Sequence, residues 1–380
     1  MRYIACVVVS CCAAAAAYLS LGLAMSPAPI AAEYWVREMI VVKHSIARRY
    51  QGRPKIIVAS GSSSLFGVDT RQLGREVGVP AINFGLHAAL PLSKILAETS
   101  LVAERGDAVI LALEPHYYCG EGVTEWQARN TIAWDHEKWN SWSTLERIEA
   151  IGALSPTAMV EIVAARLGDP KSSRSLARRV AALDDEKILS KFGAAGVPDR
   201  FGYSAYHLDN LGNMLQIGGA EFRDRARSVE AETRICSGSL ATLETFVRQM
   251  EGRGVAVRFA NSPFVSNGEY SKKRVGKVSQ KFSDAIGQIA PVLDSREDVM
   301  FPREYFFNTD SHLNDQGRKL RTQRLVRAIL SDAALSAHLG LRRESVSDAA
   351  RNSKPPLRSR RASAAHPRGT SARSSSARRR

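Results

Sequence analysis

KIIVASGSSSLFG, residues 55–67, joins an apolar run to a turn rich in small hydroxyl side chains. Residues 55–60 have the composition of a buried strand. Gly61 follows at once and allows a tight turn that exposes a side chain at the strand end. Ligands of open parallel sheets bind at the carboxyl ends of the strands. The stretch therefore predicts a parallel sheet and a reactive group at its edge.

Short apolar runs alternate with helical patterns through much of the chain. We expect strands at residues 55–60, 81–84, 108–113 and 255–260, and helices at residues 70–77, 93–105, 240–250 and 315–330. Strands that alternate with helices imply right-handed crossovers, and these place helices on both faces of a parallel sheet. The fold class predicted from the pattern is α/β.

The N-terminal segment carries no charged residue from Tyr3 to Ala32. A stretch of this length can cross a bilayer, whose core needs about 20 apolar residues. Tyr34 and Trp35 follow it as an interfacial belt would. Small residues near a possible cleavage point also fit a signal peptide, although its apolar region is normally shorter. Residues 1–32 are therefore expected to be a transmembrane anchor or a signal peptide.

The C-terminal segment, residues 341–380, is rich in Arg, Ser and Ala. Two thirds of the chain's formal charge of +15 belongs to this tail, so the rest is only mildly basic. Such a composition buries too little apolar area to offset the entropy of ordering, and we expect disorder. The tail suits anionic lipid headgroups, an acidic polysaccharide or non-specific nucleic-acid contact, or it is a solvated tail without a role. Nothing predicts a specific nucleic-acid partner.

Between these ends we expect a linker helix at residues 33–52 and an α/β domain at residues 53–338. Periodicity is poorer at about residues 120–234, which we interpret as an insertion in that domain. Helices are expected in it at residues 144–167, with a break at Ser155-Pro156, and at residues 175–183. The insertion would serve as a lid over the site or as a docking surface.

Five cysteines are present, and three of them lie in the N-terminal apolar segment. The other two are Cys119 and Cys236, which either form a disulfide outside the cytosol or remain unpaired and buried. No cysteine and histidine spacing typical of zinc occurs. We therefore expect neither a metal nor a cofactor.

DSHLN, residues 310–314, stands just before the last predicted helix. A serine hydroxyl is a weak nucleophile until a base removes its proton, and histidine suits this role because it titrates near neutrality. Chain order brings His312 back toward the edge that holds the turn at Gly61. A carboxylate would fix the histidine tautomer, and Asp310 is the nearest acid. Together the two stretches predict acyl chemistry on a serine.

These stretches resemble the sequence blocks of the SGNH (GDSL-like) hydrolase superfamily. Its first block, Gly-Asp-Ser with a later glycine, is similar to Gly61, Ser63 and Gly67, and Ser62 stands in place of the aspartate. The resemblance implies a three-layer, flavodoxin-like α/β domain, and it makes Ser63 the nucleophile. The Gly-Ser-Ser variant looks like that of membrane-anchored members that acylate surface polymers.

The last block of the superfamily is Asp-x-x-His, whereas Asp310 stands two residues before His312. The group that orients the histidine is therefore either Asp310 or a polar group near Asn308.

The middle blocks of the superfamily supply an oxyanion hole. The resemblance implies donors at the amide of Ser63 and at Gly85 or Ala88, next to Asn83. The asparagine of the third block is missing, and residues 114–118, EPHYY, follow the third strand instead. His116 or a tyrosine hydroxyl would donate in its place, or these residues are structural.

The resemblance implies an envelope-anchored serine acyl esterase or O-acyltransferase that acts on a carbohydrate polymer. Ser63 would be acylated, His312 would carry the proton and Asp310 would orient the histidine. A multispanning membrane acyltransferase is the expected partner, and the chain would be a single-pass inner-membrane protein with a periplasmic domain. The alternative is a catalytically inactive SGNH-like glycan-binding or scaffold protein of a polysaccharide assembly system.

Overall fold

The protein is described by a computed structural model that covers residues 2–120, 122–168, 184–196, 203–220, 222–226, 228, 233–266 and 272–341. The helix expected at residues 175–183 and nearly all of the tail expected at residues 341–380 lie outside the described residues.

Four parallel strands form the central sheet, in the order β2-β1-β3-β4. Their bounds are β1 Ile56–Ser60, β2 Ala81–Gly85, β3 Ala108–Leu111 and β4 Ala256–Phe259. They agree closely with the predicted strands, because strands buried on both faces are continuous apolar runs. Because β1 lies between β2 and β3, its carboxyl end at Ser60 has the carboxyl end of another strand on each side.

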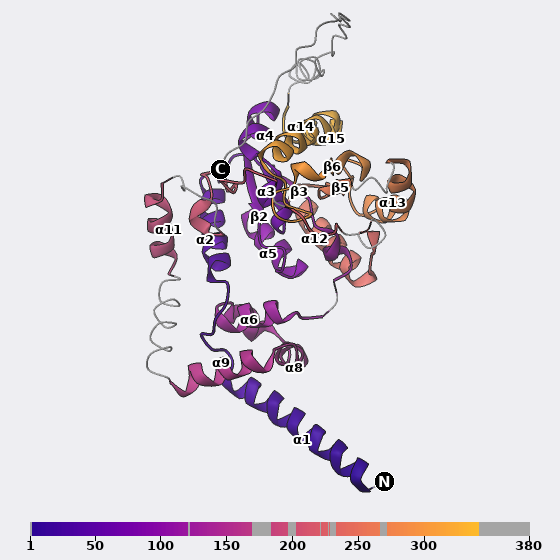
Figure 1. Cartoon of the computed structure of the whole chain (residues 1–380). Coiled ribbons are helices and arrows are strands. Elements are labelled where there is room, and N and C mark those ends of the chain that lie inside the picture. The colour runs from indigo at the N-terminus through magenta and orange to yellow at the C-terminus, as the bar shows by residue number, and fades with distance from the viewer. Residues whose placement is uncertain are drawn as a thin grey trace, which may run out of the picture.

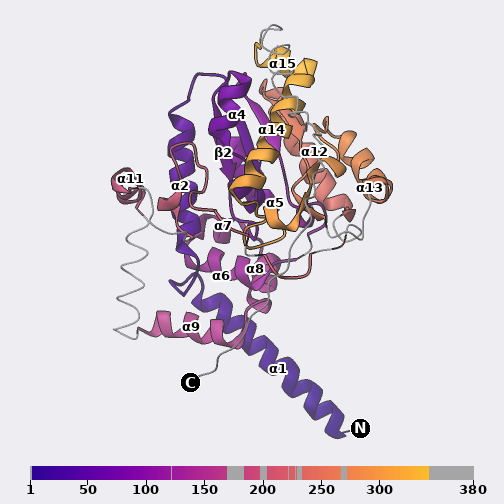
Figure 2. The same cartoon turned by 45° about the horizontal axis from the view of Figure 1, so that its top comes forward.

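Helices cover both faces of the sheet, and alternate residues of each strand pack against them. Ile57 and Ala59 of β1 belong to one hydrophobic core, and Ile56 and Val58 belong to the other. The first core includes α2 (Tyr34–Arg48), α5 (Leu92–Val102) and α12 (Ser237–Gly252). The second includes α4 (Thr70–Val77), α14 (Asp315–Ser331) and α15 (Ala333–His338), with α14 beside α4 (Figures 1 and 2). The predicted α/β architecture is confirmed.

The helix ends follow from local capping chemistry. Asp69 accepts hydrogen bonds from the amides of Arg71 and Gln72 at the start of α4, and Gly78 ends this helix with φ +83°. Asn314 caps α14 by accepting from the amide of Gly317. The cap fixes the chain just after His312 and so helps to place that side chain.

The helix expected as a linker, α2, is instead packed on the sheet. Lys43 on this helix is 1 % exposed, and its Nζ donates to the carbonyl oxygens of Asn83 at 2.9 Å and Gly212 at 3.0 Å. Burial lowers the pKa of Lys43 well below its usual value. Because this contact reaches the backbone of β2, α2 is an integral part of the α/β domain.

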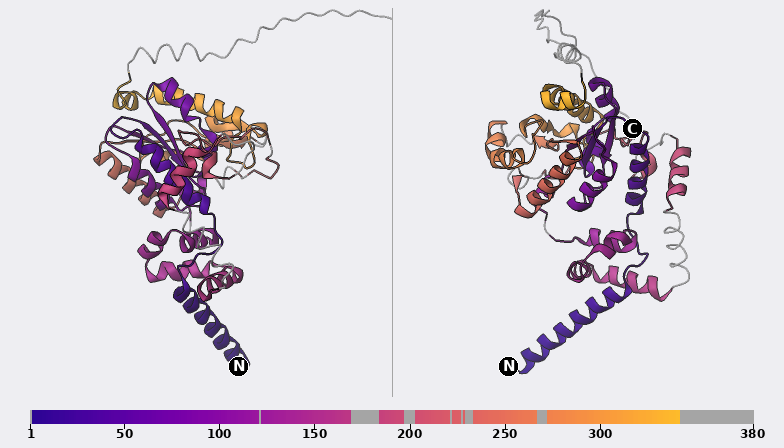
Figure 3. Two further views of the ribbon diagram at one scale, coloured as in Figure 1. Left: turned by 90° about the vertical axis from the view of Figure 1, so that its left-hand side faces the viewer. Right: turned by 180° about the vertical axis from the view of Figure 1, so that it is seen from behind.

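A layer of helices lies between the sheet and the N-terminal helix α1 (Arg2–Met25), as Figure 3 shows from two sides. Its members are α6 (Glu125–Ala133), α7 (His136–Ser141), α8 (Thr144–Gly152) and α9 (Pro156–Leu167). Ser155 caps α9 by accepting from the amide of Ala158, so the predicted break at Ser155-Pro156 separates two helices. The insertion also contributes α11 (Asp185–Ala194), which packs on α2.

α1 is long and apolar enough to cross a membrane, a property that membrane anchors and signal sequences share. Its last turns pack on α8 and α9. The hydroxyl of Tyr18 donates to the carbonyl of Leu154 at 3.0 Å, and buried Gly22 lies against Ile151 and Met159.

The remaining elements are short or lie at the edge of the domain. They are α3 (Ser62–Gly67), η1 (Pro115–Tyr118), η2 (Ala205–His207), β5 (Phe264–Ser266), α13 (Lys272–Gly287), η4 (Glu297–Val299), β6 (Met300–Pro302) and η5 (Arg303–Tyr305). β5 and β6 form a second, two-stranded parallel sheet.

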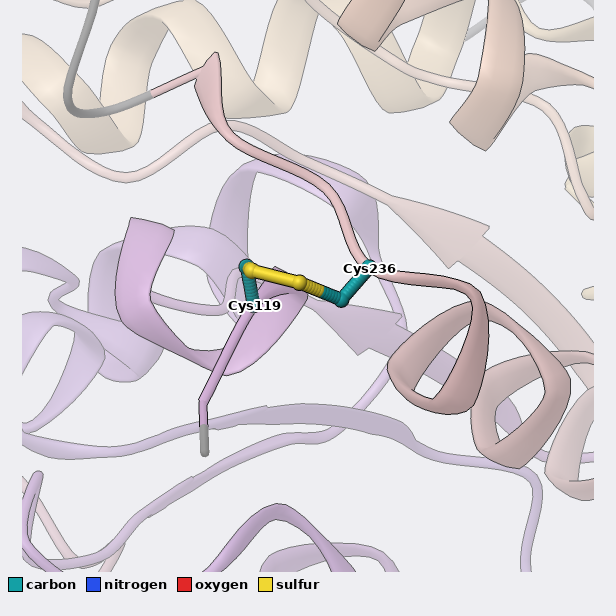
Figure 4. Close-up of a disulfide and its surroundings, with 2 residues drawn as sticks. All are labelled: Cys119 and Cys236. Carbon is teal, nitrogen blue, oxygen red and sulfur yellow. A yellow bond between two sulfur atoms is a disulfide. The ribbon is translucent and has the colours of Figure 1, made fainter. Parts of the chain in front are cut away.

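Cys119 and Cys236 form a disulfide, which resolves the alternative left open by the sequence (Figure 4). Their Cα atoms are 4.7 Å apart, within the usual range for a disulfide. Cys119 follows η1 and Cys236 is the residue before α12, so the bond joins the two ends of the insertion.

Replacing both Cys119 and Cys236 with alanine is expected to lower the free energy of unfolding by about 3–5 kcal/mol, because the bond closes a loop of more than a hundred residues in the unfolded chain. Urea unfolding in detergent, without reductant, measures the change. The matched control replaces Cys6, Cys11 and Cys12, which are free and exposed on α1, and leaves the unfolding midpoint in place. Equal stability of the two variants would contradict the prediction.

Candidate active site

Ser62 and His312 meet at the carboxyl edge of the sheet. Ser62 is the first residue of α3, directly after the turn at Gly61, and His312 lies two residues before the cap of α14. The Ser62 Oγ and the His312 Nε2 are 2.7 Å apart. Their residues are only 7 % and 6 % exposed. At this distance the hydroxyl and the imidazole form a short hydrogen bond. A serine nucleophile and its histidine base must be in such contact for the proton to pass between them.

The predicted nucleophile, Ser63, points elsewhere, and the pairing expected for it is wrong. Its Oγ donates to the carbonyl of Ala112 at 3.1 Å, and the residue is 1 % exposed. Successive residues of a helix are rotated by about 100°. Ser63 on α3 therefore faces the end of β3 while Ser62 faces the histidine.

Asn308 occupies the position expected for the acid. Its Oδ1 lies 2.9 Å from the His312 Nδ1, and its Nδ2 donates to the Tyr203 hydroxyl at 2.8 Å. The amide oxygen faces the ring, and because an amide oxygen can only accept, it accepts from the Nδ1–H of the histidine. The Nε2 is then unprotonated and can accept the proton of Ser62.

The Asp310 prediction is corrected by the same contacts. Each ring nitrogen of His312 has its own partner: Nε2 lies within hydrogen-bond distance of Ser62, and Nδ1 within hydrogen-bond distance of Asn308. The Thr309 hydroxyl accepts from the amide of His312 at 3.1 Å and thereby shapes the turn that returns Asn308 to the ring. The ring plane is fixed by stacking on Phe66, with centroids 4.0 Å apart and an interplanar angle of 11°.

Glu114, after β3, holds the turn that carries the serines. Its carboxylate accepts from the amide of Gly61 at 2.9 Å and from the amide of Ser63 at 2.7 Å, and the residue is 1 % exposed. A Cβ on Gly61 would lie 2.7 Å from both Glu114 Oε1 and the Cα of Ala88. Glycine is therefore required here for close approach, whereas its φ of −69° is ordinary.

Three of the predicted oxyanion groups have other partners, and the first is the amide of Ser63, which donates to Glu114. Asn83 is 1 % exposed and donates to the carbonyls of Ser64 at 2.7 Å and Val68 at 3.1 Å. The amide of Gly85 donates to the Asn83 Oδ1 at 3.0 Å, so the predicted role of Gly85 as oxyanion donor is not supported. Asn83 ties the end of β2 to α3 instead.

Ala88, the other predicted donor, lies against Gly61 through its backbone. Its carbonyl accepts from His116 Nε2 at 2.8 Å and from the Tyr117 hydroxyl at 2.9 Å. Burial raises the pKa of Tyr117 well above its usual value, and the charge of Glu114 adds to this shift, so the phenol stays a donor. The amides of Ser62 and Ala88 donate to no acceptor in the described part of the chain, which leaves them as the candidate oxyanion donors.

A series of aromatic rings extends outward from the histidine. Tyr203, 46 % exposed, lies 6.1 Å from Phe66 and 5.8 Å from Trp35 by ring centroids. The His87 ring stacks on the Trp126 ring with centroids 4.6 Å apart. Trp35 packs edge to face with His87, and these two centroids are 5.7 Å apart. Burial lowers the pKa of His87, and Glu33 partly offsets this shift.

Glu33 holds the two tryptophans of this series. Its carboxylate accepts from Trp35 Nε1 and Trp126 Nε1, each at 3.0 Å. Trp126 belongs to α6, so the candidate site lies on the side of the sheet that faces the helical layer and α1 (Figure 1). Within the described residues, no group of three His, Cys, Asp or Glu side chains is placed to hold a metal ion.

The contacts join Ser62, His312 and Asn308 into one hydrogen-bonded series, and Glu114 holds the turn on which the serine lies. No protein-family model matches the chain, and no curated protein is significantly similar to it.

Proposed function

We propose that the chain is an envelope-anchored serine acyl esterase or O-acyltransferase that acts on a carbohydrate polymer through an acyl-Ser62 intermediate. The observation that carries this proposal is the 2.7 Å contact between Ser62 Oγ and His312 Nε2, with Asn308 on the other ring nitrogen. The parallel strand order β2-β1-β3-β4 is also consistent with the 2-1-3-4-5 order of flavodoxin-like folds and supports an SGNH-like domain.

The proposed reaction begins when Ser62 Oγ attacks the acyl carbonyl and transfers its proton to His312 Nε2. The negative charge that develops on the carbonyl oxygen is held by the amides of Ser62 and Ala88. His312 then returns the proton to the leaving oxygen, and the acyl group remains on Ser62. In the second half, His312 takes a proton from water or a sugar hydroxyl, which attacks the acyl-serine and releases the serine with its proton restored.

Asn308 limits the rate that we expect for this reaction. An asparagine orients the histidine in papain-like cysteine proteases, so an amide is sufficient to fix the tautomer. It carries no charge, however, and stabilises the transient imidazolium less than a carboxylate does. A serine paired with a neutral amide is expected to react slowly with water.

Two features support an exported, anchored protein. The Cys119–Cys236 disulfide fits an oxidising compartment such as the bacterial periplasm. The last turns of α1 pack on α8 and α9, and cleavage would expose Ile151 and Met159 where Gly22 now lies. We therefore propose an uncleaved, single-pass anchor with the α/β domain on the periplasmic side.

The aromatic series supports a sugar acceptor. Exposed aromatic rings provide apolar faces with polar edges, and Tyr203 lies one hydrogen bond away from Asn308 and thus next to the histidine. The site faces the side of the domain from which α1 emerges, so a multispanning membrane acyltransferase is the proposed source of the acyl group. The basic tail is proposed to contact anionic groups of the membrane or polymer.

A second candidate function is a catalytically inactive SGNH-like protein that binds glycan as a scaffold in polysaccharide assembly. The neutral Asn308, in the place of the usual acid, favours it. The same aromatic series, in which Tyr203 is exposed, would then bind sugar without acyl transfer.

Reaction of the full-length protein with a fluorophosphonate probe tests the proposal. We expect covalent labelling of the peptide that contains Ser62, identified by mass spectrometry, and turnover of 4-nitrophenyl acetate. Acetyl transfer to an oligosaccharide then separates transferase from esterase. A Ser63→Ala variant is the matched control and retains labelling. A folded protein that neither labels nor turns over the ester would exclude the enzyme and leave the scaffold.

Replacing Asn308 with alanine is expected to lower kcat for 4-nitrophenyl acetate about 100-fold, because the histidine loses the group that selects its tautomer. Asn308→Asp retains a hydrogen-bond acceptor at this position and is expected to match or exceed the parent rate. Circular dichroism checks that both variants are folded. An unchanged kcat in Asn308→Ala would contradict the role assigned to Asn308.

A further inference from the structure

The helix α9 carries apolar side chains on two opposite sides. One side is buried against the protein and consists of Ala158, Met159 and Ile162. The other side, which we call the outer side of α9, consists of Val160, Val163, Ala164 and Leu167. Val160 is 68 % exposed and Leu167 is 73 % exposed. The spacing of these four residues places them on one stripe of the helix.

The charged residues of α9 bond to the rest of the protein, and the outer side carries no charged residue. Glu161 pairs with Arg129 of α6 at 2.5 Å. Arg166 donates to the carbonyl oxygens of Met25 at 2.9 Å and Pro27 at 2.6 Å, just where α1 ends. A helix that is apolar around most of its surface is normally buried, in a protein core or in a membrane.

The length of α1 places a bilayer at the level of α9. Residues 2–17 of α1 are exposed, and residues 18–25 include the turns that pack on α8 and α9. At 1.5 Å per residue the exposed part spans only about 24 Å, short of the hydrocarbon thickness of about 30 Å. Arg2 is charged and stays in the headgroup region, so an anchor that crosses the full hydrocarbon thickness from Tyr3 reaches the turn at Gly22, which lies against Met159 of α9.

We propose that the outer side of α9 lies in the boundary between lipid headgroups and acyl chains, so that lipid is its occupant. The inference rests on the anchoring of α1 in the proposed function. α9 crosses the end of α1 (Figures 1 and 2), the arrangement expected of an interfacial helix beside a spanning one. Leu145 of α8, 74 % exposed, adds an apolar side chain to the same layer.

This second membrane contact fixes the orientation of the candidate active site. α6 joins the layer to the loop after β2 through the Trp126–His87 stack and through Gln127, whose Nε2 donates to the carbonyl of Ala89 at 3.0 Å. A single helix would leave the domain free to rotate and tilt about its anchor. With α9 also in the interface, the edge that carries Ser62 faces the bilayer surface.

Depth-dependent fluorescence quenching tests the inference on the full chain in phosphatidylethanolamine and phosphatidylglycerol vesicles. Cys6, Cys11 and Cys12 are replaced with serine, and an environment-sensitive dye is attached at Val160→Cys or Leu167→Cys. Arg75→Cys, on α4 at the end of the domain away from α1 (Figure 1), is the matched solvent control. We expect lipid-borne spin labels to quench the α9 dyes at least about threefold more strongly than the dye at position 75.

A dye on a retained Cys11 reports the anchor itself. If Cys11 is quenched from the lipid while the α9 dyes are quenched by aqueous iodide as strongly as the dye at position 75, the α9 inference is wrong and the anchor stands. If the α9 dyes are shielded from both quenchers, a protein surface covers them and the lipid assignment is wrong. If Cys11 is not quenched from the lipid, the anchor and the inference both fail.

Discussion

Ser62→Ala is expected to lower kcat for ester hydrolysis by at least about 1000-fold, as loss of the serine does in other enzymes with a serine and histidine pair. Alanine removes the only atom that can attack the acyl carbonyl in the proposed reaction. The Oγ is held 2.7 Å from the base, so no rearrangement of another side chain is needed in the native protein. Turnover of 4-nitrophenyl acetate, with fluorophosphonate labelling of the same preparation, measures the loss.

Ser63→Ala is the matched control, because it removes an equal number of atoms from the next residue. Its hydroxyl bonds to the carbonyl of Ala112, and loss of this bond is expected to cost about 1 kcal/mol of stability. We expect kcat to stay within about threefold of the parent value, since the hydroxyl makes no contact with the histidine. If the Ser62→Ala variant stays active and the Ser63→Ala variant is inactive, the assignment of Ser62 is wrong. Ser63 would then be the nucleophile, as the resemblance implied.

Most of the fold could be predicted because local sequence patterns determine its strands and helix ends. The buried strands are apolar runs, and α4 has a capping aspartate and a terminal glycine at the ends of its pattern. The six-residue helix α3 could not be predicted in this way. Its residues include three buried serines, and its first turn is held by tertiary contacts, such as the hydrogen bond from the amide of Ser64 to Ser60 Oγ.

The site was predicted in outline but not in its exact members. Spacing brought a serine turn and His312 to the same edge, yet the choice between Ser62 and Ser63 depends on the rotation at the start of α3. Likewise, Asp310 is nearer to the histidine in sequence than Asn308. The turn closed by Thr309 brings Asn308, four residues before the histidine, back to the ring. This geometry decides which side chain makes the contact.

Glu114 was the most consequential omission. The resemblance implied a donor asparagine after β3, which this chain lacks, and it gave no reason to expect an acceptor with a role there. The partners of Glu114 are amides 53 and 51 residues away, and no local pattern predicts such a contact. The role of this carboxylate becomes visible only when the turn at Gly61 lies against it.

Glu114→Gln is expected to lower the free energy of unfolding by about 2–4 kcal/mol, although the side chain keeps its size. A carboxylate accepts from both amides at once, whereas glutamine offers one oxygen and turns an NH2 group toward the other amide. One buried N–H is then left unpaired, at a cost of about 1–3 kcal/mol, and the charge assistance of the remaining bond is lost. Urea unfolding of the full chain in detergent measures the difference.

Activity is expected to fall along with stability in this variant. Ser62 lies between Gly61 and Ser63, the two residues whose amides Glu114 holds, so the nucleophile moves when either bond is lost. A displacement of about 1 Å is enough to reduce kcat roughly 100-fold. Glu104→Gln is the matched control, because Glu104 also accepts from a backbone amide, that of Gly52 at 2.9 Å, but its side chain is 36 % exposed. Water can replace the Glu104 contact with Gly52, and Lys55, which lies 3.7 Å from Glu104, keeps its ion pair with Asp107 at 2.7 Å, so both stability and kcat should stay near the parent values. Equal behaviour of the two variants would show that the buried carboxylate does not position the serine.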